Sequence, residues 1–368
     1  MSDDENDIKL KMIKLDGNFL EGGGQIVRTG LALSSLLGKQ FSVNEIRHGR
    51  KKPGLKAQHL NCVKALEELC GAKCEGVELG SESLVFEPGQ LKPQTINIDI
   101  GTAGSITLML QSLLLPAILG GGKYIFKIKG GTDTKWSMPV DYFKEVLVPQ
   151  LRRYANIEFK IIKRGYFPTG GGEIELKIKG KYVISNSNLN EAPKLELIEQ
   201  GYIMKICGVS HASAKLVDAN VAERQARAAK QKLAKLFDCP INIRTEYQNT
   251  SSVGTGIMLW AVFSKVTDDI DVHNPIILGG DALGERGKSA EIIGEIAAQN
   301  LIDQINTCAP VDKYLADNLI PFLGFFGGQI KCSELTNHAL TNIYSCEQFI
   351  GKRFEIDKDN KIINSNID

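Results

Sequence analysis

Glu21-Gly22-Gly23-Gly24-Gln25-Ile26-Val27-Arg28 is a run of three glycines that leads directly into a segment with a helical pattern, residues 25–37. The glycines allow positive φ angles and let backbone amides approach a ligand closely. A basic segment, residues 47–54, reads Arg-His-Gly-Arg-Lys-Lys-Pro-Gly, and Gln58-His59 follows it. Glycine-rich backbone beside clustered cations predicts a phosphate-rich substrate.

The order of helices and strands that starts at this opening recurs along the chain. The first copy continues with a strand over 41–46, a helix over 54–70 and strands up to residue 100. The second copy opens with Gly101-Thr102-Ala103-Gly104-Ser105 and has these predicted elements: a helix to about Leu119, a strand over 124–129, a helix from near Pro139, and strands over 157–162 and 173–178. A third glycine-rich opening, residues 279–287, precedes a helix over 289–305. The period is longer than the roughly 20 to 50 residues of a solenoid repeat. The pattern therefore predicts an α+β fold with a few copies of one unit around a shared centre.

A polar segment, residues 185–193, separates the second copy from a stretch of different character. That stretch has the pattern of a strand over 202–209, a long charged helix over 214–237, and strands over 241–247 and 256–265. We therefore predict a small inserted α+β domain, residues 186–276. The large repeated domain then comprises residues 1–185 and 277–368.

Composition limits the functional classes. The chain has 368 residues, is 43% hydrophobic and carries a formal net charge of +1. A protein that coats nucleic acid over a long footprint needs a broad basic field, so a compact basic pocket for one strand end fits better. The start of the chain, residues 1–7, is acidic, and no apolar run reaches bilayer length. Eight scattered cysteines form no Cys-x-x-Cys pair, which predicts reduced thiols and neither a zinc ribbon nor a disulfide framework. We expect a soluble intracellular protein.

Two short motifs resemble nucleotide-binding signatures only weakly. Lys14-Leu15-Asp16-Gly17 matches the four residues around the lysine of covalent nucleotidyltransferases, but the sequence fits an ordinary strand that ends in an Asp-Gly turn. Gly287-Lys288-Ser289 resembles the end of a P-loop, yet Ala282 stands where the first glycine belongs. Lys288 is therefore predicted to be a solvated residue in the first turn of a helix.

Among five histidines, His338 has the most polar surroundings, Ser333 to Asn342, at the predicted start of a helix. Thr336 or Asn337 could cap that helix, with an incidental histidine beside the cap. No His-x-x-x-His spacing surrounds it, so a catalytic His338 would act as a nucleophile or as a general acid or base.

Several separated segments together resemble the signatures of RNA 3'-terminal phosphate cyclases. They are the glycine run 21–28, residues 47–55 with 58–59, residues 101–105, residues 130–132, residues 164–168 with 170–173, and Asn337-His-Ala-Leu-Thr-Asn342. They occur in order over nearly the whole chain. The resemblance implies repeated units of two helices on a four-stranded sheet, with a small α+β domain inserted before the last unit.

The resemblance also implies a reaction and its residues. His338 would be adenylated by ATP, pass AMP to an RNA 3'-phosphate, and so allow the 2'-OH to close a 2',3'-cyclic phosphate. Glu21 would hold Mg²⁺ or Mn²⁺, with Arg28 near the polyphosphate. The other implied ATP contacts are Gln111, Pro139, Tyr142, Tyr314, Asp317 and Asn318. The implied RNA phosphate contacts are Arg47, Arg50 and Gln58.

Plainer roles for some of these residues stay open on the sequence. The basic cluster 47–52 also fits a solvated loop, and Glu21 fits a carboxylate at a helix N-terminus. Tyr314 at helical spacing from Val311 and Asn318 fits simple packing. Two positions depart from the family pattern: Asn318 stands where glutamine is expected, and Tyr142 where phenylalanine is an alternative.

Three functional classes fit the chain to different degrees. The ATP-dependent cyclase is favoured, because ribosome-assembly relatives of the same fold bind RNA but lack the catalytic histidine. An enolpyruvyl transferase on a similar scaffold would need a different anion site and no covalent nucleotide. We expect RNA 3'-phosphate ends as partners, no membrane, and a cytoplasmic location, a nuclear one staying open for a eukaryotic protein. The sequence predicts no oligomeric state.

Overall fold

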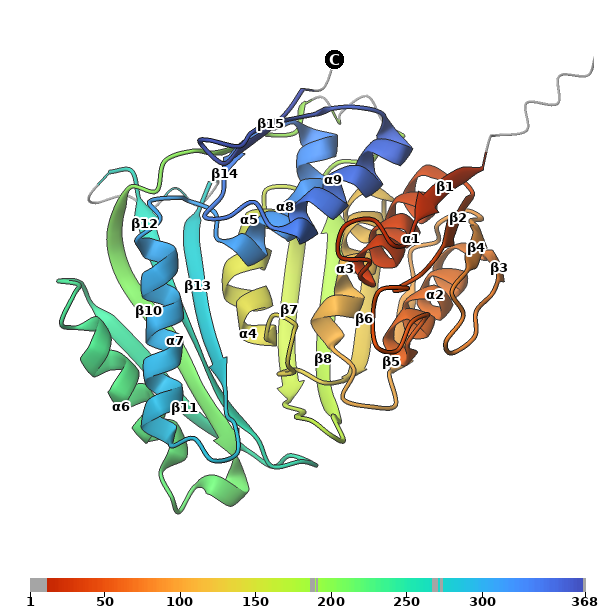
Figure 1. Cartoon of the computed structure of the whole chain (residues 1–368). Helices are drawn as coiled ribbons and strands as arrows, with labels where there is room; N and C mark the ends of the chain where they lie inside the picture. The colour runs from red at the N-terminus through yellow and green to blue at the C-terminus, as the bar shows by residue number, and fades with distance from the viewer. Residues whose placement is uncertain (1–11, 186–188, 190, 267–270, 272–273, 367–368) are drawn as a thin grey trace, which may run out of the picture.

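The computed structural model describes residues 12–185, 189, 191–266, 271 and 274–366. Within these ranges the chain forms four mixed sheets of four strands each, and helices pack on every sheet (Figure 1). The predicted α+β fold of repeated units is therefore confirmed. None of the helices in these ranges is long and apolar enough to cross a bilayer.

Three of the units share one connectivity. The first consists of β1 (Ile13–Asp16), α1 (Gln25–Leu37), β2 (Phe41–Asn44), α2 (Ala57–Cys70), β3 (Lys73–Glu75) and β4 (Leu84–Glu87). The second consists of β5 (Thr95–Asp99), α3 (Ile106–Leu119), β6 (Lys123–Gly130), α4 (Val140–Tyr142), the π-helical η1 (Phe143–Leu147), α5 (Val148–Leu151), β7 (Ala155–Lys163) and β8 (Gly172–Gly180). The last consists of β9 (Leu195–Leu197), α8 (Lys313–Phe326), β14 (Gly328–Lys331), α9 (Asn337–Ile350), β15 (Phe354–Asp357) and β16 (Ile362–Ser365). Their sheets have the orders β1-β2-β4-β3, β5-β6-β8-β7 and β9-β14-β16-β15, and in each the first two strands are parallel.

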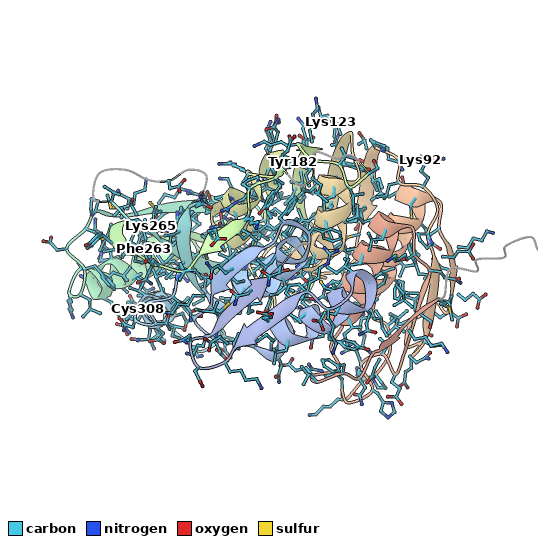
Figure 2. All side chains as sticks on the ribbon, turned by 90° about the horizontal axis from the view of Figure 1, so that it is seen from above. Lys92, Lys123, Tyr182, Phe263, Lys265 and Cys308 are labelled. Carbon is cyan, nitrogen blue, oxygen red and sulfur yellow. The ribbon has the colours of Figure 1, made fainter. Side chains whose placement is uncertain are left out.

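The inserted unit lies between β9 and α8 and has a different order. Its elements are β10 (Tyr202–Ser213), the short 3₁₀ helix η3 (Ala214–Leu216), α6 (Val221–Leu233), β11 (Ile241–Gln248), β12 (Thr255–Ser264), β13 (Ile276–Leu283) and α7 (Ala290–Ile305). The sheet order is β11-β10-β12-β13. Seen from above, this unit and the first unit lie at opposite ends of the molecule, with Lys265 and Cys308 at one end and Lys92 toward the other (Figure 2).

The inserted sheet extends beyond residue 276, the predicted end of the inserted domain. β13 hydrogen-bonds along β12 and so belongs to the inserted sheet, whereas its glycines were interpreted as a loop that opens the next unit. A Cβ at Gly279 would lie 2.5 Å from the Tyr142 ring, and one at Gly280 would lie 2.4 Å from the Leu301 nitrogen. These glycines therefore serve close packing of a strand. The division into two domains stays a prediction, and residues 186–188 and 190 of the predicted linker lie outside the described ranges.

Four helices, α1, α3, α8 and α9, pack against one another in the middle of the molecule (Figure 1). Helix α3 is apolar around almost its whole circumference, as expected of a helix enclosed by others. Helix α1 is buried from Gln25 to Leu36, and this buried stretch includes the polar side chains of Gln25 and Arg28. Because buried polar groups need partners, these side chains mark the point where the central helices build a polar site.

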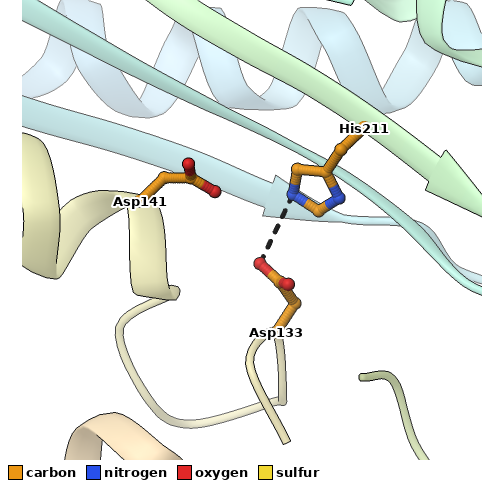
Figure 3. A group of neighbouring side chains, drawn as sticks. All are labelled: Asp133, Asp141 and His211. Carbon is orange, nitrogen blue, oxygen red and sulfur yellow. Dashed lines mark ion pairs between the residues drawn. The ribbon is translucent and has the colours of Figure 1, made fainter. Parts of the chain in front are cut away.

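A buried charge cluster joins the second unit to the inserted unit. Figure 3 shows Asp141 on α4, Asp133 on the loop before it and His211 on β10, with their side chains pointing toward one another. The Nη1 atom of Arg164 lies 2.7 Å from Asp141 Oδ2 and 3.3 Å from Asp133 Oδ2. His211 Nε2 lies 3.3 Å from Asp133 Oδ1, and Glu246 Oε1 accepts from Arg164 Nε at 2.6 Å. The guanidinium of Arg164 balances the negative charge of the two aspartates. The cluster is therefore an ion-pair network that joins two units.

Candidate active site around His338

His338 lies in the first turn of α9, and the hydroxyl of Thr336 caps this helix by accepting from the Ala339 amide at 3.0 Å. The predicted cap is thus confirmed. The imidazole is about half exposed and opens into a pocket of about 350 Å³. The pocket is lined by Glu21, Lys313, Tyr314, Asp317 and residues 334–338. An accessible imidazole in a pocket of this size has room for a small phosphorylated ligand.

Gln25 fixes the orientation of the His338 ring. Its Oε1 atom contacts Nδ1 at 2.5 Å, and its Nε2 atom donates to the backbone carbonyl of His338 at 3.1 Å. With the amide in this orientation, Nδ1 carries the hydrogen and Nε2 faces the pocket, 3.3 Å from Glu21 Oε2. Gln25 is not among the site residues predicted from the sequence. The available signal was a polar residue directly after the glycine run, on a helix whose neighbours are apolar.

Burial is the main cause that lowers the pKa of His338 below its ordinary value, and the nearby cations Arg28 and Arg50 lower this pKa further. Glu21 opposes these effects. The imidazole is therefore neutral at pH 7, which is the state that a nitrogen nucleophile requires.

We expect this lowered pKa to appear in a titration of the free protein. The NMR signal of the His338 ring should titrate below pH 6.5, because burial and two cations disfavour the charged ring. In Arg50→Ala the midpoint should move up, since one of those cations is removed. A midpoint above 6.5 in the wild-type protein, or a downward move in Arg50→Ala, would contradict the assigned causes.

A chain of hydrogen bonds places a buried cation behind the pocket. Arg28 Nε donates to Gln111 Oε1 at 2.9 Å, and Gln111 Nε2 donates to Asn318 Oδ1 at 3.1 Å. Asn318 Nδ2 in turn donates to the carbonyl of Tyr314 at 2.7 Å. Burial lowers the pKa of Arg28 to about 10, so its guanidinium stays charged at neutral pH. Three helices, α1, α3 and α8, thus hold one positive charge beside the imidazole.

Carboxylates of Glu21, Asp317 and Glu334 line the pocket. Burial is the main cause that raises the pKa of Asp317 to about 7; the hydrogen bond from Thr336 opposes this rise, and the charges of Asp312, Glu21 and Glu334 add to it. Such crowding of negative charge fits a site completed by a cation. Glu21 is partly exposed, and one carboxylate together with substrate phosphates is a common Mg²⁺ ligand set. Among the described residues, the pocket therefore fits a divalent cation at Glu21.

Two predicted nucleotide contacts lie behind the pocket wall. Tyr142 is buried, its hydroxyl donates to Asp312 Oδ1 at 2.6 Å, and its ring meets that of Tyr314 edge to face, with centroids 6.2 Å apart. Pro139 immediately precedes α4, which carries Tyr142. Tyr142 therefore supports Tyr314, whose partly exposed ring lines the pocket. Direct contacts of Pro139 and Tyr142 with a nucleotide stay predictions.

Of the predicted RNA contacts, Arg50 lies next to Glu21, and Arg47 and Gln58 have other neighbours. Arg50 Nη2 lies 3.3 Å from Glu21 Oε2, so the two charges share one edge of the site. Arg47 uses Nη1 to donate to the carbonyls of Lys52 and Gly54, at 2.8 and 3.0 Å, which folds the basic loop. Gln58 lies at the start of α2, where a Cβ on Gly104 would be 3.7 Å from its Cβ. Lys14, by contrast, is exposed on β1 and does not line the pocket.

Comparisons with known proteins agree on one family. A family model described as RNA 3'-terminal phosphate cyclase matches residues 19–356. A protein of this name from Pyrococcus furiosus is 44% identical over 348 residues, which cover 94% of this chain and 95% of that protein. Proteins of the same name from Thermococcus onnurineus and Saccharolobus islandicus are 43% and 42% identical, and the matches cover 94–95% of this chain and 96% of each protein.

Proposed function

The chain belongs to the RNA 3'-terminal phosphate cyclase family, and we propose that it converts an RNA 3'-terminal phosphate into a 2',3'-cyclic phosphate through adenylate carried on His338. The observation that carries the proposal is the neutral imidazole whose Nδ1 is held by Gln25 and whose Nε2 faces a pocket between Arg28 and Glu21. The membership itself supports RNA 3'-terminal phosphate cyclase activity, and ATP as the co-substrate is part of the proposal.

In the first step, His338 Nε2 attacks the α-phosphorus of ATP. A P–N bond forms, the bond from the α-phosphorus to the bridging oxygen breaks, and pyrophosphate leaves. Positive charge develops on the ring in this step, and Gln25 Oε1 stabilises it by accepting from Nδ1–H. The positive charge of Arg28 attracts the negatively charged polyphosphate toward the pocket. A divalent cation bound at Glu21 would neutralise the phosphates further.

The remaining steps move AMP to the RNA. An oxygen of the RNA 3'-phosphate attacks the adenylate, the P–N bond breaks, and a phosphoanhydride between RNA and AMP forms. The neighbouring 2'-OH then attacks the RNA phosphorus, closes the ring and expels AMP. A phosphate monoester has no good leaving group, whereas the anhydride supplies one to an intramolecular nucleophile. We assign the hold on the terminal phosphate to Arg50, whose contact with Glu21 at the edge of the site supports this role.

The binding-protein alternative is not favoured. A relative that only binds RNA has no use for an oriented neutral imidazole, and both His338 and Glu21 are present here in contact with each other. The same contact disfavours an enolpyruvyl transferase, which needs no covalent nucleotide.

An end-labelled RNA assay tests the proposed function. With ATP and Mg²⁺, the protein should convert a 3'-phosphate end into a product that resists phosphatase, because a cyclic phosphodiester has no terminal monoester. The matched RNA with a 3'-hydroxyl should stay unchanged. Conversion without ATP, or equal turnover of both ends, would contradict the proposal.

A further inference from the structure

Two exposed aromatic side chains have no role in the mechanism above. Trp136 is 94% exposed and Phe167 is 76% exposed, although neighbouring residues hold the loops that carry them in place. A bridge pairs the backbones of Asp133 and Tyr166, so the loops that carry the two rings run side by side. Tyr166 is buried and its hydroxyl lies 2.7 Å from His211 Nδ1, while Thr134 and Ser137 join their hydroxyls across the first loop at 2.8 Å. Large rings presented on fixed backbone indicate a binding surface.

The two loops are linked to one of the predicted RNA contacts through loop 101–104. Gln58 lies against Gly104 of the loop 101–104. On the other side of that loop, a Cβ at Gly170 would lie 2.6 Å from the Thr102 carbonyl oxygen, and one at Gly131 would lie 2.5 Å from that of Ala103. Loop 101–104 therefore packs against Gln58 and also against residues 131 and 170, which lie close in sequence to Trp136 and Phe167.

The charge next to this surface suits a phosphate backbone. Lys135, adjacent to Trp136, lies 3.7 Å from Glu285, and Lys288 lies 2.8 Å from the same carboxylate. Arg286 is exposed between them in sequence. Two lysines share one carboxylate and so leave one positive charge in excess, and the exposed Arg286, next to Glu285 in sequence, adds another. The segment 285–288, which includes part of the weak P-loop motif, thus contributes positive charge next to Lys135.

We propose that the nucleotides preceding the 3'-phosphate of a single-stranded RNA stack on Trp136 and Phe167, while Lys135, Arg286 and Lys288 contact their phosphates. Base stacking on aromatic rings tolerates any sequence, and cations along the strand add salt-dependent affinity. The inference rests on the proposed function, since it assigns the path of the RNA that ends at His338. It also gives the inserted unit a role, because α7 and the segment before it belong to that unit.

Tryptophan fluorescence tests the stacking directly. The chain has two tryptophans, and Trp260 is only 7% exposed, so Trp136 should dominate any quenching by RNA. A ten-nucleotide single-stranded RNA with a 3'-phosphate should quench the emission, and Trp136→Phe should lose the quenching. Quenching that persists in Trp136→Phe would overturn the assignment of the stacking ring.

Kinetics separate this inference from the proposed function. In the double variant Trp136→Ala/Phe167→Ala, the KM for the ten-nucleotide RNA should rise at least about tenfold, since each lost stack weakens binding several-fold. Self-adenylation with ATP alone, which needs no RNA, is the reference reaction and should stay at the wild-type rate. The matched control is Tyr202→Ala, which removes an exposed aromatic at the N-terminal end of β10, outside the proposed surface, and should leave this KM unchanged.

Each outcome decides one claim. An unchanged KM for the long RNA in the double variant would overturn the inference and leave the two rings as a protein-docking patch. An equal rise of KM for a 3'-phosphorylated dinucleotide would also overturn it, because the proposed stacking should favour the longer RNA. Failure of the wild-type protein to cyclise either RNA would instead contradict the proposed function.

Discussion

His338→Ala should abolish self-adenylation and lower cyclase turnover by at least about 10³-fold, because removal of a covalent nucleophile leaves only binding contributions. The ring is half exposed in the first turn of α9, so its loss should leave the fold intact. The measurement is the amount of α-labelled phosphate retained on denatured protein after incubation with ATP and Mg²⁺.

Lys14→Ala serves as the control for this experiment. Lys14 belongs to the weak nucleotidyltransferase motif, but it is exposed on β1 and does not line the pocket. Its variant should retain the label at the wild-type level. Label retained in His338→Ala and lost in Lys14→Ala would reverse the assignment of the nucleophile.

Arg164→Met should destabilise the protein by about 3–5 kcal/mol, the effect of leaving buried charges without their partner. The guanidinium is almost fully buried and pairs with Asp133, Asp141 and Glu246. Burial opposes ionisation of Asp133, but His211 and Arg164 hold its pKa well below the ordinary value. Without Arg164, the two buried aspartates lose their main counter-charge. Urea unfolding followed by circular dichroism measures the change in the free energy of unfolding.

Arg224→Met is the matched substitution at an exposed ion pair. Arg224 contacts Glu291 through two nitrogens at 2.7 and 2.9 Å, but both side chains are about 40–45% exposed. We expect a much smaller loss than in Arg164→Met, since water screens such exposed pairs. Similar losses in the two variants would show that the network around Arg164 is not what joins the second unit to the inserted unit.

The local signals in the sequence predicted most of the repeated elements. The helix over 25–37 has the predicted bounds, and Gly101–Ser105 opens α3 with Ser105 accepting from the Leu108 amide as a cap. Such features depend on glycine, capping residues and apolar spacing within a few positions. They could be inferred without knowledge of distant contacts.

Features built from distant residues could not be predicted in this way. β9 has only three residues and pairs with β14 across more than a hundred positions, so the point of insertion carries no local pattern. Gly279 and Gly280 are small because Tyr142 and Leu301 press against them, not because a loop needs their flexibility.

Residues of the site whose partners are distant in sequence were also not predicted from local patterns. The resemblance to a family supplied His338, Glu21 and Arg50, which contact one another through Glu21. Gln25 and the network around Arg164 were missed, because their partners lie far away in the sequence and only the fold brings them together.

Mapping the adenylate by mass spectrometry tests the central claim most directly. The protein is incubated with ATP and Mg²⁺ without RNA, digested under mildly alkaline conditions that preserve phosphoramidates, and its peptides are searched for added AMP. We predict AMP on the peptide that contains His338, and its loss after acid treatment. AMP on Lys313, the lysine that lines the same pocket, or on Lys14 would contradict the account.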